Sequence, residues 1–159
     1  MKKTLITLAL FISITTLVWA DGKQDALKFF NNYVNAANTY DTSVGDMYSP
    51  SAKIIREVVK PDGGLVDVGT DTATYVKQMK LSQATAKLRK YTNAYSDIKV
   101  TDLGNGKYKV SALRQPKGET YYLKMYQIIQ KQPNGKWLIV EEMMQTKEQI
   151  FLKFQGKSN

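Results

Sequence analysis

Two adjacent glutamates near the end of the sequence are the first candidates for chemistry. Residues 134–145 read NGKWLIVEEMMQ, in which an apolar run ends at Glu141 and Glu142. Side chains alternate between the two faces of a strand, so one of these carboxylates is expected to point into the protein. A buried carboxylate can act as a general acid or base, or it can pair with other polar groups and orient the core.

The turn before this strand predicts its pairing with the strand that precedes it. Residues 133–135, Pro-Asn-Gly, are typical of a three-residue hairpin loop with glycine in the left-handed position. A two-residue Asn-Gly turn would shift the register by one, but the three-residue loop pairs apolar residues with apolar residues. It places Ile129 opposite Ile139, Gln127 opposite Glu141 and Met125 opposite Met143. One face then carries Met125, Gln127, Trp137, Ile139, Glu141 and Met143. The other face carries Tyr126, Leu138, Val140 and Glu142.

The composition narrows the chemistry that these residues can support. The sequence contains no histidine and no cysteine, which excludes Ser-His-Asp and Cys-His nucleophile systems and zinc sites built from those residues. It contains no P-loop, dinucleotide-binding fingerprint or calcium loop. We therefore expect no metal and no cofactor, and only carboxylates, tyrosine, lysine and arginine remain as acids, bases or electrostatic groups.

The formal net charge of +9 comes mainly from scattered lysines. Because no dense cluster of arginines and aromatic residues occurs, we do not expect nucleic-acid binding. The charge is compatible with an acidic protein partner or with an anionic surface of the cell envelope.

The first twenty residues predict export. Lys2 and Lys3 precede an apolar run over residues 5–18, and a small-residue cleavage site follows at residues 18–20. The mature chain is expected to begin at Asp21 and to be periplasmic or secreted.

Residues 21–159 are expected to form a single α+β domain. Apolar residues at helical spacing predict helices at the start of this domain, and a hairpin, another helix and an antiparallel meander are expected to follow. This order is typical of a domain in which helices pack on one side of a sheet. The expected helices cover residues 24–40, a short stretch within 42–49, and a segment that starts after Thr70 or Asp71. The expected strands cover residues 52–59, 65–68, 96–103, 107–114, 119–130 and 136–145.

Three segments carry a resemblance to a known superfamily. The stretches MYSPSAKI (47–54), VDVGTDTATYV (66–76) and NGKWLIV (134–140) resemble the nuclear-transport-factor-2-like superfamily, which includes steroid isomerase, scytalone dehydratase and SnoaL-like cyclases. The resemblance implies a bent, mainly antiparallel sheet cupped around helices, a cystatin-like cone. It also implies that Trp137 and Ile139 face the concave side. Glu141 is then the inward glutamate and Glu142 faces outward.

The candidate site follows from this assignment. Glu141 is the candidate acid or base, and its pKa would be raised unless a cation such as Arg56 or Arg114 reaches it. Several enzymes of this superfamily use a catalytic histidine, and this sequence contains none. The candidate ligand-binding residues are Gln127, Glu141, Trp137, Met125, Met143, Tyr33, Tyr48 and Arg56.

The opposite sheet face is expected to be covered. Tyr126, Leu138 and Val140 form an apolar patch there, and the resemblance favours a homodimer through this face. The alternative is that the apolar segment at residues 150–154 folds over it.

Three functions fit the sequence. The first is an exported binding module for a small apolar or amphipathic ligand, or for a protein partner. The second is an isomerase or dehydratase that uses Glu141. The third is an envelope interaction protein, such as an inhibitor, immunity or secretion component.

Overall fold

The computed structural model describes residues 13–156, with side chains from residue 22 onward. The predicted export signal, residues 1–20, lies largely outside the described residues and stays a prediction. Over residues 13–156, no helix has both the length and the apolarity needed to cross a membrane. The elements are α1 (Ser13–Asn38), the 3-10 helix η1 (Thr42–Met47), β1 (Tyr48–Val59), β2 (Leu65–Thr70), α2 (Thr72–Leu88), β3 (Asn93–Gly104), β4 (Lys107–Pro116), β5 (Leu123–Lys131), β6 (Trp137–Thr146) and the 3-10 helix η2 (Gln149–Phe154).

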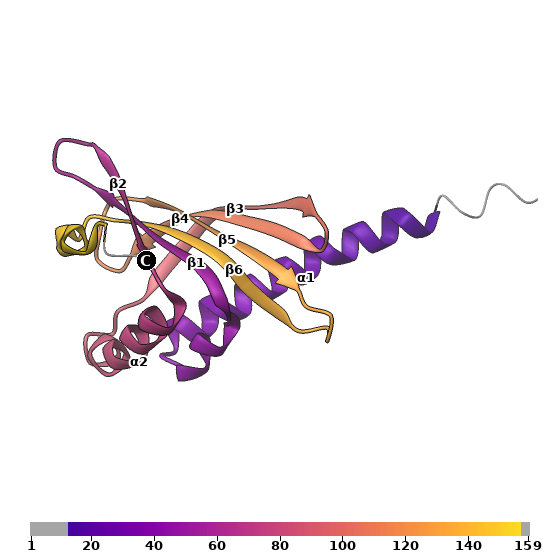
Figure 1. Cartoon of the computed structure of the whole chain (residues 1–159), viewed down its shortest axis with the longest axis horizontal. Helices are drawn as coiled ribbons and strands as arrows, with labels where there is room; N and C mark the ends of the chain where they lie inside the picture. The colour runs from indigo at the N-terminus through magenta and orange to yellow at the C-terminus, as the bar shows by residue number, and fades with distance from the viewer. Residues whose placement is uncertain (1–12, 157–159) are drawn as a thin grey trace, which may run out of the picture.

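The strands form one bent six-stranded sheet in the order β2-β1-β6-β5-β4-β3. The β1–β6 pair is parallel, and the other neighbouring strands are antiparallel. Helices α1 and α2 lie on the same side of this sheet (Figure 1). The predicted α+β architecture, with helices on the concave face of a mainly antiparallel sheet, is confirmed.

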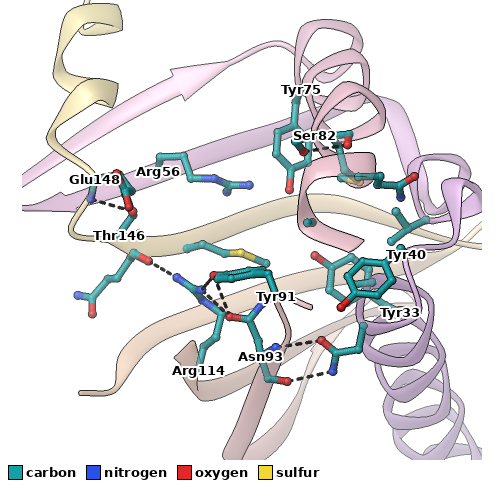
Figure 2. Close-up of a pocket in the computed structure, with 18 of the residues that line it drawn as sticks. Tyr33, Tyr40, Arg56, Tyr75, Ser82, Tyr91, Asn93, Arg114, Thr146 and Glu148 are labelled. Carbon is teal, nitrogen blue, oxygen red and sulfur yellow. Dashed lines mark hydrogen bonds between the residues drawn. The ribbon is translucent and has the colours of Figure 1, made fainter. Parts of the chain in front are cut away.

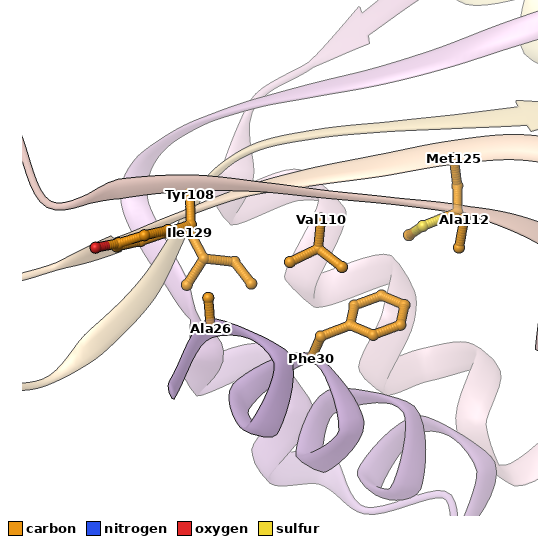
Figure 3. Close-up of a cluster of buried hydrophobic side chains, with 7 residues drawn as sticks. All are labelled: Ala26, Phe30, Tyr108, Val110, Ala112, Met125 and Ile129. Carbon is orange, nitrogen blue, oxygen red and sulfur yellow. The ribbon is translucent and has the colours of Figure 1, made fainter. Parts of the chain in front are cut away.

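Helix α1 packs against β4 and β5 through one apolar stripe. Ala26 and Phe30, one helical turn apart, are fully buried against the concave side of these strands. Every second residue of β4 from Tyr108 to Pro116 is buried, so this strand follows the two-residue period of a sheet with one covered face. Figure 3 shows the resulting cluster of Ala26, Phe30, Tyr108, Val110, Ala112, Met125 and Ile129.

A second apolar cluster joins α1 and η1 to β1 and β6. Its buried members are Tyr33, Val44, Tyr48, Ala52, Ile54 and Ile139. Helix α2 begins beside this cluster, where the Asp71 side chain accepts a hydrogen bond from the amide of Thr74 at 2.8 Å. This N-cap confirms the predicted start of the helix and satisfies one of its free amide groups.

The hairpin between β5 and β6 has the predicted three-residue loop. The amide of Gln132 donates to the carbonyl of Lys136 at 2.7 Å, and Gly135 has a φ of 81°. Glycine adopts this left-handed conformation without steric cost. Ile129 consequently pairs with Ile139, as predicted.

The register changes immediately after this pair. Ile128 lies opposite Glu141, so Val140 is an extra residue on β6 and forms a β-bulge. The pairing of β6 with β1 is irregular at the same level, between Tyr48 and Lys53, in a stretch that contains Pro50. Proline has no amide hydrogen to donate to a neighbouring strand, which favours an interrupted ladder here. The bulge exchanges the faces of all β6 residues that follow it.

Candidate functional site

The bulge makes Glu142, and not Glu141, the inward glutamate. Glu142 is 0 % exposed and lies opposite Gln127, the position predicted for Glu141. Glu141 lies on the outer face, where it accepts a hydrogen bond from the Tyr126 hydroxyl at 2.6 Å. The predicted faces of both glutamates were therefore wrong, because the prediction assumed an uninterrupted alternation along the strand.

The same shift affects the methionines of this strand. Met144 packs against both concave clusters and lies opposite Met125, whereas the predicted partner was Met143. Met143 lies opposite Tyr126 and was wrongly assigned to the concave face.

One carboxylate oxygen of Glu142 is surrounded by donors from three other elements. Its Oε2 accepts hydrogen bonds from the Tyr48 hydroxyl at 2.6 Å and from the Gln127 amide nitrogen at 2.9 Å. The Tyr33 hydroxyl on α1 lies 3.4 Å from the same oxygen. Strands β1 and β5 and helix α1 are thus tied to β6 at a single atom.

The other oxygen is bound by a cation. Nη2 of Arg56 lies 3.1 Å from Glu142 Oε1, and the hydroxyl of Tyr75 on α2 lies 3.3 Å from it. The Arg56 guanidinium also stacks over the Tyr75 ring, 4.6 Å from its centroid. A buried carboxylate is costly unless it is both ion-paired and hydrogen-bonded, and Glu142 is both.

The electrostatics of the cluster fix its protonation states at neutral pH. Burial, and secondly the charge of Glu142, raise the pKa of Tyr33 and of Tyr48 well above the usual value. Burial raises the pKa of Tyr75 to about 12, although Arg56 lowers it in part. Burial lowers the pKa of Arg56, but Tyr75 and Glu142 outweigh this and raise it overall. The tyrosines therefore remain hydrogen-bond donors and Arg56 remains charged.

A cavity of about 330 Å³ lies between this cluster, the two helices and the sheet. Figure 2 shows side chains from several elements converging on it. Its wall includes Tyr33 from α1, Tyr75 and Met79 from α2, Arg56 from β1, Arg114 from β4 and Met144 from β6. The wall combines apolar surface with a few convergent polar groups, as ligand pockets do.

Arg114 is fixed in the wall by neutral oxygens. Its Nη1 donates to the Asn93 side chain at 2.8 Å and lies 3.4 Å from the Tyr91 hydroxyl, and its Nη2 donates to the carbonyl of Gln145 at 2.8 Å. Asn93 is itself held by two hydrogen bonds to the side chain of Asn38. These contacts set the orientation of the guanidinium in the cavity wall (Figure 2).

The 3-10 helix η2 contributes side chains to the cavity wall. A second space of about 800 Å³, lined in part by Arg56 and Tyr75, is also bordered by Phe151 and Phe154. Phe151 lines the first cavity as well. Phe151 and Phe154 of segment 150–154 therefore lie on the concave side of the sheet. The alternative in which this segment covers the outer patch does not hold for these two residues.

The structure separates the predicted ligand-binding residues into four groups, of which Glu141 and Met143 on the outer face are one. Tyr33 and Arg56 line the cavity, while Tyr48 and Gln127 bind Glu142 from within the core. Met125 is a core residue of the α1 cluster. Trp137 packs against Tyr108 of the same cluster, with 5.7 Å between ring centroids, so it fills the core.

Several cavity residues were not predicted as ligand contacts. Arg114 belongs to the buried face of β4 together with Val110 and Ala112, so the alternation of that strand carries a signal for it. Met144 lies beyond the bulge, where alternation fails, and Tyr91 lies in a loop without periodicity. Across the part of the chain that is described, no group of three acidic, histidine or cysteine side chains could hold a metal ion.

Comparisons with known proteins agree on the fold. No family model and no curated protein matches the sequence, but many solved structures match the chain. An NTF2-like protein of unknown function from Shewanella oneidensis has a TM-score of 0.59 at 14% identity, over 77% of this chain and 98% of that one. A candidate scytalone dehydratase from Novosphingobium aromaticivorans has a TM-score of 0.57 at 12% identity, over 83% and 86%. A protein of unknown function from Pectobacterium atrosepticum has a TM-score of 0.55 at 21% identity, over 79% and 91%.

These matches confirm the predicted resemblance at the level of the fold. The chain has the cone-shaped α+β fold of nuclear-transport-factor-2-like proteins. This fold carries enzymes and binding proteins alike, so the function has to be argued from the site.

Proposed function

We propose that this protein is a binding module that holds a small amphipathic molecule on the concave face of its sheet. The observation that carries this proposal is the 330 Å³ cavity. Met79, Met144 and Phe151 offer it apolar surface, and Arg114 and the ion-paired Arg56 offer polar groups. Its volume is at the lower end of the range of roughly 300–1,000 Å³ found for ligand pockets. The space of about 800 Å³ that shares Arg56 and Phe151 with it adds further room.

The acid–base alternative has less support. A general base has to come within hydrogen-bond reach of the proton that it removes. Glu142 is 0 % exposed, is ion-paired with Arg56 and is surrounded by donors on both oxygens. Glu141, the candidate from the sequence, lies on the outer face beside Tyr126. An isomerase or dehydratase reaction at either carboxylate would require a rearrangement of these contacts.

The site of action that we propose is the periplasm or the exterior of the cell. The support for this is the positive start, apolar run and small-residue cleavage site of residues 1–20. N-terminal sequencing of the protein from cell-envelope or culture fractions should yield Asp21. A chain from those fractions that retains Met1 would contradict this proposal.

A fluorescent probe can test the binding function. Anilinonaphthalene sulfonate combines an aromatic body with an anionic group and fluoresces in apolar sites, so we expect saturable binding with one probe per chain. Ala86 lines the cavity from α2, whereas Ala84 on the same helix is exposed. Ala86→Phe should fill the cavity and abolish this binding.

Ala84→Phe is the matched control, because it adds the same ring to the same helix outside the cavity. It should bind the probe as the unmodified protein does. Equal binding by both variants, or no saturable binding by the unmodified protein, would contradict the proposal.

A further inference from the structure

The guanidinium of Arg114 is a buried positive charge without an acidic partner. The residue is 8 % exposed. The residues with described side chains form two ion pairs, Arg56–Glu142 and Lys60–Asp62, and neither includes Arg114. Burial of a charge is costly unless an opposite charge compensates it. A negative charge beside Arg114 would offset this cost, and the described residues do not supply one.

The donors of Arg114 are only partly used. A guanidinium has five N–H donors, and Nε of Arg114 has no hydrogen-bond acceptor. The acceptors at the other nitrogens, from Tyr91, Asn93 and Gln145, carry no formal charge. The uncompensated charge thus belongs to a residue of the cavity wall, while Nε itself is buried and has no acceptor.

The other charged residues of the cavity do not compensate the positive charge of Arg114. Arg56 lines the same space, but Glu142 compensates its charge at 3.1 Å. Glu148 also lines the cavity, but its side chain belongs to an exposed residue, where water and salt screen its field. One positive charge in excess remains on the buried part of the wall.

We propose that the ligand is a monocarboxylate whose anionic group pairs with Arg114. This inference rests on the binding function proposed above and specifies its ligand class. A single excess charge favours a monoanion, and the planar fork of a guanidinium matches the two oxygens of a carboxylate. Met79, Met144 and Phe151 then contact the apolar body of the ligand.

Calorimetric titration of the unmodified protein with three probes tests the ligand class. Octanoate carries the proposed carboxylate, octanamide has the same chain without the charge, and inorganic phosphate is an anion without an apolar body. Octanoate should bind about tenfold or more tightly than octanamide, because a hydrogen bond to a charged group is stronger than a neutral one. Phosphate should not compete with octanoate.

Two arginine variants test whether Arg114 causes the preference for octanoate over octanamide. Arg114→Gln should bind octanoate and octanamide with similar affinity, because the charge that distinguishes them is gone. Arg89 is exposed and caps the C-terminal end of α2, so Arg89→Gln removes the same charge outside the cavity. It should keep the full preference for octanoate. If Arg114→Gln does not fold, the preference of the unmodified protein still decides the ligand class.

The outcomes separate this inference from the binding function itself. Equal affinity of the unmodified protein for octanoate and octanamide, abolished in both cases by Ala86→Phe, would overturn the carboxylate assignment and leave the cavity a binding site. Competition by phosphate, or an undiminished preference in folded Arg114→Gln, would also overturn it. Failure of both octanoate and anilinonaphthalene sulfonate to bind would overturn the two proposals together.

Discussion

Arg56 Nη2 lies 3.1 Å from Glu142 Oε1, and the two side chains are only 12 % and 0 % exposed. The pair connects β1 to β6, the one parallel pair of neighbouring strands in the described sheet. Because both charges are buried, removal of either one leaves the other uncompensated and lowers the stability of the fold.

We expect Glu142→Gln to destabilise the protein by about 3–5 kcal/mol, because it leaves the charge of Arg56 buried without its partner. The free energy of unfolding, measured by urea denaturation, checks this value. Glu141→Gln is the matched control at the next residue. Glu141 is on the outer face and partly exposed, so the change should stay within about 0.5 kcal/mol. The reverse ranking of the two variants would contradict the assigned faces.

We expect the stability of the protein to fall in alkaline solution. Burial raises the pKa of Tyr75 to about 12, so the folded state keeps this proton more tightly than the unfolded state, where the pKa is about 10. The contribution is complete below pH about 10 and is lost as pH rises to about 12. Tyr33 and Tyr48, whose pKa values are also raised, extend the loss further.

Urea denaturation at increasing alkaline pH measures this dependence. Tyr75→Phe cannot ionise, so its stability should fall less steeply across the interval. Tyr122 is exposed, and Tyr122→Phe should leave the dependence unchanged. A flat stability over this pH interval in the unmodified protein would count against the buried tyrosine cluster.

We expect Phe30→Ala to cost about 3–5 kcal/mol of unfolding free energy, because it opens a cavity between α1 and the sheet. Phe30 is fully buried and packs edge-on against Tyr95, 5.6 Å between ring centroids. Thermal or chemical denaturation measures the loss. Leu88 on α2 is 84 % exposed, and Leu88→Ala should cost less than about 0.5 kcal/mol. A similarly small cost at Phe30 would exclude the described packing of α1.

We propose that the protein self-associates through the outer face of the sheet, where Tyr126, Leu138 and Val140 are each only partly buried within one chain. Leu138→Lys should shift a dimer to a monomer in sedimentation experiments while the fold is retained. We choose Leu138 because a change at Val140 would also affect the bulge. An unmodified protein that sediments as a monomer at every concentration would contradict the proposal.

Local signals in the sequence were enough for most of the fold. The cap at Asp71, the glycine turn at Gly135 and the buried alternation of β4 depend on residues that are close together in the chain. These signals act between neighbouring residues, so they could be predicted without knowledge of distant contacts. The same alternation also points Arg114 inward, although the sequence alone does not show that it lacks an acidic partner.

The identity of the buried glutamate was decided only by the tertiary structure. A β-bulge adds one residue to one strand, and Val140 gives no local sign of it, because a β-branched residue is typical of regular strands. The donors that hold Glu142 come from Tyr33, Tyr48 and Arg56, which are 109, 94 and 86 residues away in the chain. The sequence determined that one of two adjacent carboxylates would be buried, since a strand has two faces. Which of them is buried depends on the bulge and on partners that only folding brings together.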